Sequence, residues 1–154
     1  MFKCILVAVD FSDFSQEAVR IASGLAEGDD CRVLVLHVCN APKAVDPAIM
    51  VAQSRAINSL IELQKEMAKA AEKKLKDWIG SYDWNGARVS HEVLSGVDYK
   101  VIANRAREIE ADLIVMGSYG RSGFARRLIG STTEKVLRKT RCPLLAVTIP
   151  VLQG

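Results

Sequence analysis

Glycine and serine residues recur at fixed intervals in the last third of this sequence, in a pattern suited to holding an anion. Gly117, Gly120 and Gly123 follow one another at three-residue steps, and nine residues separate Gly120 from a Gly130-Ser131 pair. Glycine lets a ligand approach the backbone closely, and successive main-chain N–H groups in such bends form an anion-binding concavity. We therefore predict a phosphate held between the bend at Gly120 and the bend at Gly130-Ser131.

The helix predicted after this loop and the charged residues near it also affect the prediction of a phosphate site. The sequence Ser131-Thr132-Thr133-Glu134 has the form of a capping box, which predicts a helix beginning at Ser131. The free N–H groups and the dipole at such a helix start favour an anion. Arg121 is close enough in the sequence to add positive charge, whereas Glu134 opposes it. The alternative is that the glycines only form turns and that Ser131 is an ordinary N-cap.

Candidate residues also gather at the ends of the apolar runs that predict strands. In an open parallel sheet, ligands bind outside the carboxyl ends of the strands, near the point where the strand order reverses. This rule directs attention to four places: Val9-Asp10-Phe11-Ser12, Val38-Cys39-Asn40, Ser95-Gly96-Val97-Asp98 and Met116-Gly117-Ser118-Tyr119-Gly120. Asp10 is the clearest acidic candidate, with Ala8 and Val9 beside it. Its alternative role is to cap the following helix with Ser12 or Asp13.

Apolar runs alternate with helical patterns along the whole chain, and this order predicts the fold. The runs cover residues 4–9, 32–38, 88–94, 112–116 and 144–149, and helical patterns begin near Asp13, Ala52, Tyr99 and Ser131. The third run alternates like an edge strand, whereas the first, second and fourth are apolar on both faces. The sequence therefore predicts one α/β domain over residues 1–154, an open five-stranded parallel sheet with helices on both faces.

The longest helical pattern runs from about residue 52 to residue 79, after a predicted surface loop over residues 40–52. Its apolar positions recur at three- and four-residue steps, with Lys and Glu on the other side. We interpret this stripe as core, and it comprises Leu60, Leu63, Met67, Ala71, Leu75 and Trp78. His37 is expected to be a satisfied core histidine, and His91 is expected on an exposed face.

Composition and missing motifs exclude several classes of function. The formal net charge is only +3, with both signs interspersed, so we expect no nucleic-acid partner. No apolar run approaches the roughly 20 residues that span a bilayer, and the N-terminus lacks a signal-peptide pattern, so we expect a cytoplasmic protein without a membrane partner. The four cysteines are scattered, which argues against zinc. A P-loop and a dinucleotide fingerprint are both absent.

The spaced glycines resemble the nucleotide-binding pattern of a known family. The order Gly117-x-x-Gly120, nine residues, then Gly130-Ser131 resembles that of the universal stress proteins, in their ATP-binding branch. The opening Ile5-Leu6-Val7-Ala8-Val9-Asp10-Phe11-Ser12 is similar to the first strand and turn of that family. Leu36-His37-Val38 and Cys142-Pro143-Leu144-Leu145-Ala146-Val147 are similar to its second and last strands.

The resemblance implies a Rossmann-like fold of the adenine-nucleotide α-hydrolase type, ATP as ligand and Mg²⁺ or Mn²⁺ beside it. It places Asp10 at the ribose or the adenosine side, Val38 at adenine, and Met116 and Gly117 beside the adenosine. It gives the phosphates to Gly120, Gly130, Ser131 and Thr132, and Tyr119 stands where many members have histidine. The cofactor-binding residues expected on all these grounds are Ala8, Val9, Asp10, Val38, Met116, Gly117, Ser118, Gly120, Arg121, Gly130, Ser131 and Thr132. The family also implies a homodimer formed through the last strand, Leu144 to Leu152.

The expected function is therefore that of a nucleotide-binding stress or regulatory protein that holds ATP with little or no hydrolysis. Hydrolysis needs a group that orients water and carboxylates that hold Mg²⁺, and Asp10 is the only convincing acid in the pattern. Two alternatives remain open. One is a weak ATPase or adenylate-handling enzyme on the same fold, and the other is a dimeric interaction module that binds no nucleotide.

Overall fold

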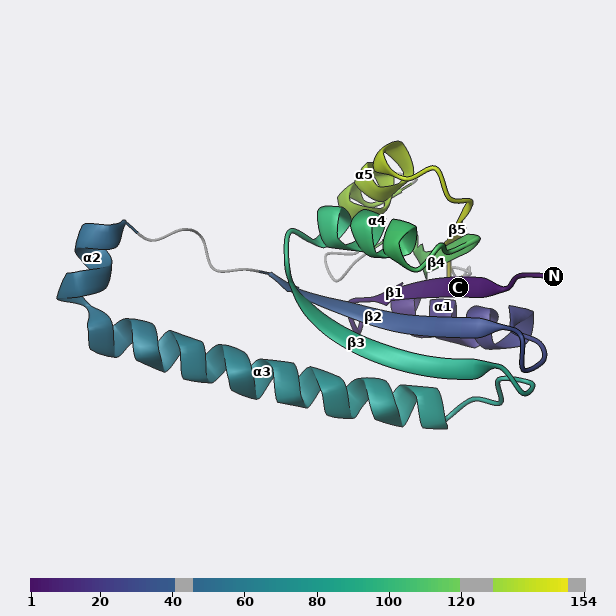
Figure 1. Ribbon diagram of the computed structural model, residues 1–154, viewed down its shortest axis with the longest axis horizontal. Helices are drawn as coiled ribbons and strands as arrows, with labels where there is room; N and C mark the ends of the chain where they lie inside the picture. Colours follow the sequence, from purple (N-terminus) through teal and green to yellow (C-terminus); the bar gives the residue numbers. More distant parts are fainter. Residues whose placement is uncertain (41–45, 120–128, 150–154) are drawn as a thin grey trace, which may run out of the picture.

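Parallel strands form a single five-stranded sheet in the order β3-β2-β1-β4-β5 (Figure 1). The computed structural model describes residues 1–40, 46–119 and 129–149. Its strands are β1 (Cys4–Val9), β2 (Arg32–Asn40), β3 (Arg88–Gly96), β4 (Leu113–Gly117) and β5 (Leu144–Val147). The predicted parallel α/β sheet is confirmed, with the third run on an edge. The prediction ended β2 two residues early and ended β5 two residues late.

The centre of the sheet is its most apolar part. Every residue of β1 and of β4 is buried, and β1 pairs with β2 on one side and with β4 on the other. Leu6 lies level with Leu34 and with Ile114, so large apolar side chains form a continuous row across three strands. Two-sided burial explains why these runs lack polar alternation.

Helices cover both faces. Helices α1 (Asp13–Leu25) and α3 (Ser54–Gly80) supply Val19 and Leu75 to the core on one face. Helices α4 (Asp98–Glu108) and α5 (Ser131–Lys139) supply Ile102 and Val136 to the core on the other, and lie above the sheet in Figure 1. None of the helices in these ranges has the length and apolar character that a bilayer-spanning segment needs.

Helices α1 and α5 begin at the predicted residues, Asp13 and Ser131, and the N-cap of each is the residue before. The N-cap of α1 is Ser12, whose Oγ accepts the Ser15 N–H at 3.2 Å, and Asp13 is already helical. The N-cap of α5 is Gly130, which has no side chain to offer, and Ser131 is the first helical residue. The capping-box sequence at Ser131 therefore does not cap this helix, and its first N–H groups are left for another acceptor.

The segment before the long helix also differs from the prediction. Residues predicted as loop include a short helix, α2 (Pro47–Ala52), which begins on a proline as helices commonly do. In Figure 1, α2 and the first half of α3 extend past the end of the sheet. For this reason Leu60, Leu63 and Met67 are 52%, 55% and 58% exposed, and the core interpretation of the stripe is wrong for them. It holds for Ala71 and Leu75, which are buried over the sheet.

Candidate functional site

A cavity of about 690 Å³ opens at the carboxyl ends of the strands. The strand order reverses between β1 and β4, because the chain moves from β1 toward β2 and later returns to the other side. The cavity lies at this reversal, as the rule for open parallel sheets predicts. It is lined by Ala8, Val9, Asp10, Ser15, Leu36, His37, Val38, Cys39, Asn40, Gln64, Met67, Ala68, Ser95, Asp98, Ile102, Met116, Gly117, Tyr119, Gly130, Ser131, Thr132 and Thr133.

The end of β4, at Gly117 and Ser118, adjoins the bend at Gly130, although the two are separated in sequence. The Gly130 N–H donates to the Ser118 carbonyl oxygen at 2.6 Å, and the Thr133 hydroxyl donates to the Gly117 carbonyl oxygen at 2.8 Å. The Ser118 N–H donates to the carbonyl oxygen of Val147 in β5 at 2.7 Å. The end of β4, the start of α5 and the end of β5 are thus joined by main-chain groups, which fixes their positions at the cavity.

The start of α5 presents unused hydrogen-bond donors to this cavity. The Gly130 N–H is already bonded to Ser118, which removes it from the set of donors that we predicted for the phosphate. Across the described ranges, no acceptor is bonded to the N–H groups of Ser131, Thr132 and Thr133, and all three residues line the cavity. Unpaired N–H groups at the positive end of a helix dipole form a site for an anion.

Gly117 also has a packing role that we did not predict. An added Cβ on Gly117 would lie 2.7 Å from Phe14 Cβ, so this glycine permits α1 to pack closely against the end of β4. Gly130 has φ −66° and ψ 159°, a conformation open to any residue. Gly120 and Arg121 lie outside the described residues.

Asp10 takes part in a local turn and also lines the cavity. Its Oδ1 accepts the Ser12 N–H at 3.0 Å, and its own N–H donates to Ser15 Oγ at 3.3 Å. Ser12 rather than Asp10 is the helix cap. The two roles that we weighed for Asp10 are compatible, because the turn holds the carboxylate at the cavity wall.

Phe11 supports this turn in a way that the sequence did not suggest. It has φ 63°, a left-handed conformation that is uncommon for a bulky side chain. Its ring lies 4.5 Å from the His37 ring and 5.3 Å from Trp78, measured between centroids. These contacts hold the residue in a conformation that a bulky side chain otherwise avoids, which is the usual condition for backbone strain to persist. The only signal for this role in the sequence is that an aromatic residue directly follows the aspartate at the end of the first strand.

His37 and Cys39 line the same wall of the cavity from β2. His37 Nδ1 donates to the Val9 carbonyl oxygen at 2.8 Å, since a carbonyl can only accept. The ring is satisfied as predicted, but it is partly exposed rather than in the core. Burial raises the pKa of the Cys39 thiol, which keeps it protonated and a poor nucleophile at neutral pH.

Two further walls come from residues outside the predicted set of cofactor-binding residues. Asp98, at the start of α4, accepts the Tyr99 N–H on Oδ1 at 2.6 Å and the Thr132 hydroxyl on Oδ2 at 2.8 Å. It thereby joins the N-termini of α4 and α5 and brings a second carboxylate to the cavity. Gln64 and Met67 of α3 form the opposite wall. The strand-end rule had pointed to residues 95–98, but nothing in the sequence pointed to α3.

Most of the predicted site residues come together here. Ser118 is the exception among the described ones: it is 1% exposed, it is not part of the lining, and its Oγ has no hydrogen-bond partner in the described part of the chain. The predicted residues that line the cavity are Ala8, Val9, Asp10, Val38, Met116, Gly117, Gly130, Ser131 and Thr132.

Comparison with known proteins identifies the family of this chain. The model of the universal stress protein family matches residues 1–148, so the chain belongs to that family. Universal stress protein MJ0531 of Methanocaldococcus jannaschii is 34% identical over 150 residues, which are 97% of this chain and 84% of that protein. The resemblance seen in the glycine pattern is thereby confirmed.

Solved structures agree with this assignment. The structure of the M. jannaschii protein MJ0577 superposes with a TM-score of 0.78 at 26% identity, and the alignment covers 98% of this chain and 99% of that one. A universal stress protein from Archaeoglobus fulgidus, solved in complex with dAMP, has the same fold, with a TM-score of 0.56 at 20% identity over 96% of this chain and 98% of that one.

Proposed function

We propose that this universal stress protein binds ATP, with Mg²⁺ or Mn²⁺, in the 690 Å³ cavity and acts as a regulatory, stress-responsive protein. The observation that carries the proposal is the set of unpaired N–H groups at Ser131, Thr132 and Thr133, facing a cavity at the strand reversal. The complex of a family member with dAMP supports an adenine nucleotide as ligand. Three helix-end amides suit a phosphate and would be poorly used by a neutral ligand.

The cavity has two chemically different ends, which suggest how the nucleotide lies. The phosphate end is the start of α5, where main-chain donors gather. The other end is lined by Val38 and Cys39 of β2, where apolar atoms and strand-end main-chain groups suit a flat base. Asp10 directly follows β1, which lies between β2 and β4, and a ribose hydroxyl there would need an acceptor.

A divalent cation fits the charges present. Asp10 and Asp98 bring two carboxylates to the cavity, and a triphosphate beside them would be repelled. Mg²⁺ or Mn²⁺ bound to the phosphates would offset this charge, and carboxylate and hydroxyl oxygens are the ligands that such hard cations prefer. Asp98 and Thr132 are the residues best placed to face that ion.

We further propose that hydrolysis is slow or absent. Among the described lining residues, His37 Nδ1 is held by the Val9 carbonyl and the Cys39 thiol has a raised pKa. Asp98 accepts two hydrogen bonds, and Asp10 is part of a turn. None of these groups is arranged as a base that orients water for phosphoryl transfer.

The family resemblance also leads us to propose a homodimer in the cytoplasm. β5 is an edge strand with Leu145 37% exposed, and pairing it with a second copy would cover that edge. Residues 150–152 of the proposed interface lie outside the described ranges. Four free cysteines suit a reducing compartment. Light scattering of the purified chain checks the dimer, and a monomer at micromolar concentration contradicts it.

Isothermal titration calorimetry with ATP and Mg²⁺ tests the nucleotide proposal. We expect one site per chain and selectivity for ATP over GTP. In a parallel melting experiment, ATP at one hundred times its Kd should add about 2.7 kcal/mol to the free energy of unfolding. If the titration releases heat and a malachite-green assay detects no released phosphate, the protein binds ATP without hydrolysing it. No heat and no melting shift at millimolar ATP would reject the proposal.

A further inference from the structure

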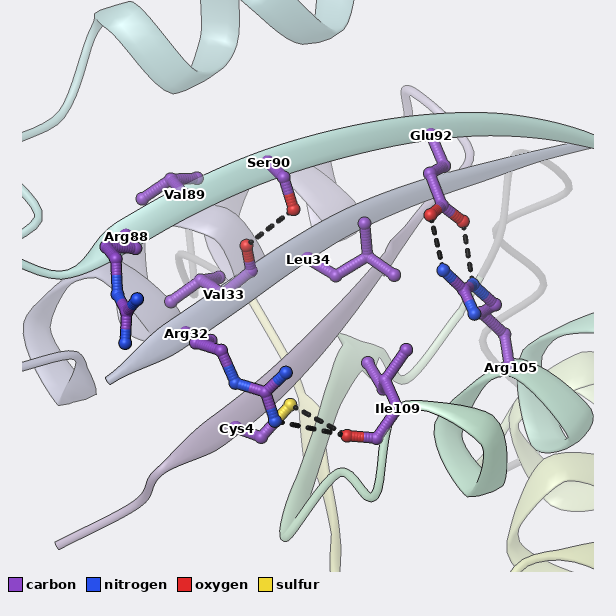
Figure 2. A pocket seen from close by; sticks show the side chains of 10 residues that line it. All are labelled: Cys4, Arg32, Val33, Leu34, Arg88, Val89, Ser90, Glu92, Arg105 and Ile109. Atoms are coloured by element: carbon purple, nitrogen blue, oxygen red, sulfur yellow. Dashed lines mark hydrogen bonds and ion pairs between the residues drawn. The ribbon is translucent and has the colours of Figure 1, made fainter. Parts of the chain in front are cut away.

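A second groove lies at the opposite end of the sheet, where the strands begin (Figure 2). Its volume is about 280 Å³, and it lies on the face covered by α4, beside the uncovered part of β3. Figure 2 shows Arg32 and Arg88 at one end of the groove, Leu34 and Ser90 along it, and Arg105 at the other end. None of these residues belongs to the site proposed for the nucleotide.

Arg32 and Arg88 occupy equivalent positions on adjacent strands. They are register partners in the parallel pair formed by β2 and β3, so their side chains leave the same face of the sheet. Figure 2 shows both side chains on the side of the strands where Ile109 lies. An Arg32 Nη donates to the Ile109 carbonyl oxygen at 3.4 Å, and Arg88 Nε donates to the Asp29 carbonyl oxygen at 2.8 Å. Main-chain oxygens thus hold both groups while most of their N–H donors remain available.

No carboxylate forms an ion pair with Arg32 or Arg88 within the part of the chain that the structure describes. Two carboxylates near the groove have other partners. Glu92 accepts from Arg105 twice, at 2.6 Å and 2.8 Å, and both Oδ atoms of Asp112 accept main-chain N–H groups, of Lys3 and Cys4. Like charges on directly neighbouring strand positions repel. Two guanidinium groups in this position therefore favour an anion between them.

The other residues that line the groove determine which organic group the bound anion can have. Leu34 and Ile109 offer apolar surface beyond the arginines, and Ser90 adds a hydroxyl. The Cys4 thiol also lines the groove, and burial raises its pKa, so it adds no negative charge. A ligand with a charged head and a small apolar body would use both ends.

We propose that this groove binds the phosphate monoester of a small apolar molecule, with the phosphate between Arg32 and Arg88 and the organic group over Leu34 and Ile109. A phosphate monoester carries a charge of about −1.5 to −2 at pH 7. This charge matches two guanidinium groups better than the single charge of a carboxylate, and guanidinium forms paired hydrogen bonds to phosphate oxygens. The site does not depend on the proposed nucleotide function.

Titration of the ¹⁵N-labelled full chain with phenyl phosphate, followed by NMR, tests the site. We expect saturable shifts at the amides of Arg32, Arg88 and Ser90 in a sample already saturated with ATP. The variant Arg32→Gln/Arg88→Gln should bind phenyl phosphate at least tenfold more weakly. Both side chains are exposed, so this variant should fold, and Arg88→Gln alone serves if it does not. Arg107→Gln, an exposed α4 arginine outside the groove, is the matched control and should bind as the wild type does.

Benzoate distinguishes the class of ligand, because it has the same ring and one negative charge. We expect it to bind at least fivefold more weakly than phenyl phosphate. Equal affinity for the two would overturn the assignment to phosphate monoesters. Unchanged binding in the double variant, or shifts only at Ser131 and Thr132, would overturn the groove as the site.

Discussion

The two ends of the sheet differ in how they attract negative charge. At the carboxyl end, the described lining of the cavity contains no lysine or arginine, and the donors are main-chain N–H groups at the start of α5. At the amino end, the groove is lined by Arg32, Arg88 and Arg105, and its donors are side chains. One end therefore depends on backbone geometry, and the other depends on residue type.

Chain direction explains this difference. In a parallel sheet with helical crossovers, helices begin near the carboxyl ends of the strands and end near their amino ends. Positive helix ends, such as those at Asp98 and Ser131, therefore gather at the carboxyl end of the sheet. Carbonyl oxygens, such as that of Ile109, gather at the amino end. An anion at the amino edge must be bound by side chains that outweigh those carbonyls. Variants at the two ends should accordingly behave differently.

The largest expected effect is that of Gly130→Val on ATP binding. Gly130 lines the cavity at the start of α5, where a side chain would occupy space next to the free N–H groups. Its φ of −66° suits valine, so the backbone should persist. We expect ATP affinity to fall at least a hundredfold, about 2.7 kcal/mol, as measured by calorimetry.

The matched control is Gly24→Val, in α1, where an added Cβ meets no atom within 4 Å. It should bind ATP as the wild type does. Phenyl phosphate binding at the amino end should be unchanged in both variants. If Gly130→Val retains wild-type ATP affinity with an intact circular dichroism spectrum, the backbone site at α5 is refuted.

Gly117→Ala should have the next largest effect, on stability rather than on binding. The new Cβ would lie 2.7 Å from Phe14 Cβ and 3.0 Å from the Phe14 carbonyl carbon, and the latter is backbone that cannot easily move. Overpacking of this kind costs about 2 kcal/mol, which urea denaturation measures. Gly24→Ala, with open space around it, should instead stabilise α1 by about 0.5–1 kcal/mol. A neutral Gly117→Ala would show that this glycine does not serve packing.

The contrast between Gly117, which packs against Phe14, and Gly24, which has open space around it, shows what the sequence could and could not reveal. The alternation of strands with helices and the five-stranded parallel sheet follow from patterns that extend over many residues, and this fold class was predicted correctly. The reason for Gly117 depends on Phe14, which is distant in sequence and meets it only in the fold. The exposure of Leu60 could not be predicted either, because helical periodicity does not tell how far a helix extends past its sheet.

The functional site and the second groove likewise depend on contacts between residues that are distant in sequence. Asp98 faces Thr132 only because α4 and α5 begin side by side, a contact between residues 34 positions apart in the chain. Arg32 and Arg88 begin two different strands, and only the register of β2 with β3 places them together. Local patterns identified strand ends as the place for a ligand, but the partners across the sheet required the structure.

Asp98→Asn should change how ATP binding depends on the divalent cation. Asparagine can still accept the Thr132 hydrogen bond but removes a negative charge from the phosphate end. Without Mg²⁺, we expect ATP to bind this variant about tenfold more tightly than the wild type, about 1.4 kcal/mol. With Mg²⁺ the advantage should disappear. Calorimetry in EDTA and in Mg²⁺ measures both.

The control is Asp29→Asn, which removes the same charge at the amino end of the sheet and should leave ATP binding unchanged under both conditions. Identical Mg²⁺ dependence in the wild type and in Asp98→Asn would show that Asp98 does not face the phosphates. If the wild type binds no ATP at all, the nucleotide proposal itself fails, and this outcome is separate.

The smallest expected effect is that of Glu92→Gln on stability, at the amino end. Hydrogen bonds from Arg105 hold the pKa of Glu92 below its usual range. A lowered pKa in the folded state means that the stabilisation is complete above the unfolded-state value, about 4.3, and is lost as the pH falls through the folded-state value. We expect Glu92→Gln to cost about 1 kcal/mol at pH 7, measured by urea denaturation, and the deficit to shrink below about pH 4.

Glu62→Gln on α3 provides the comparison, because Glu62 pairs with Lys65 at 3.5 Å and both side chains are more than half exposed. Such a pair contributes little to stability, so removing it should leave the free energy of unfolding nearly unchanged at every pH. If Glu92→Gln is equally silent, Arg105 is not neutralised by Glu92, and it would then be a third cation available to an anion in the groove. The variant therefore measures how much of the positive charge at the amino end is already used by the protein itself.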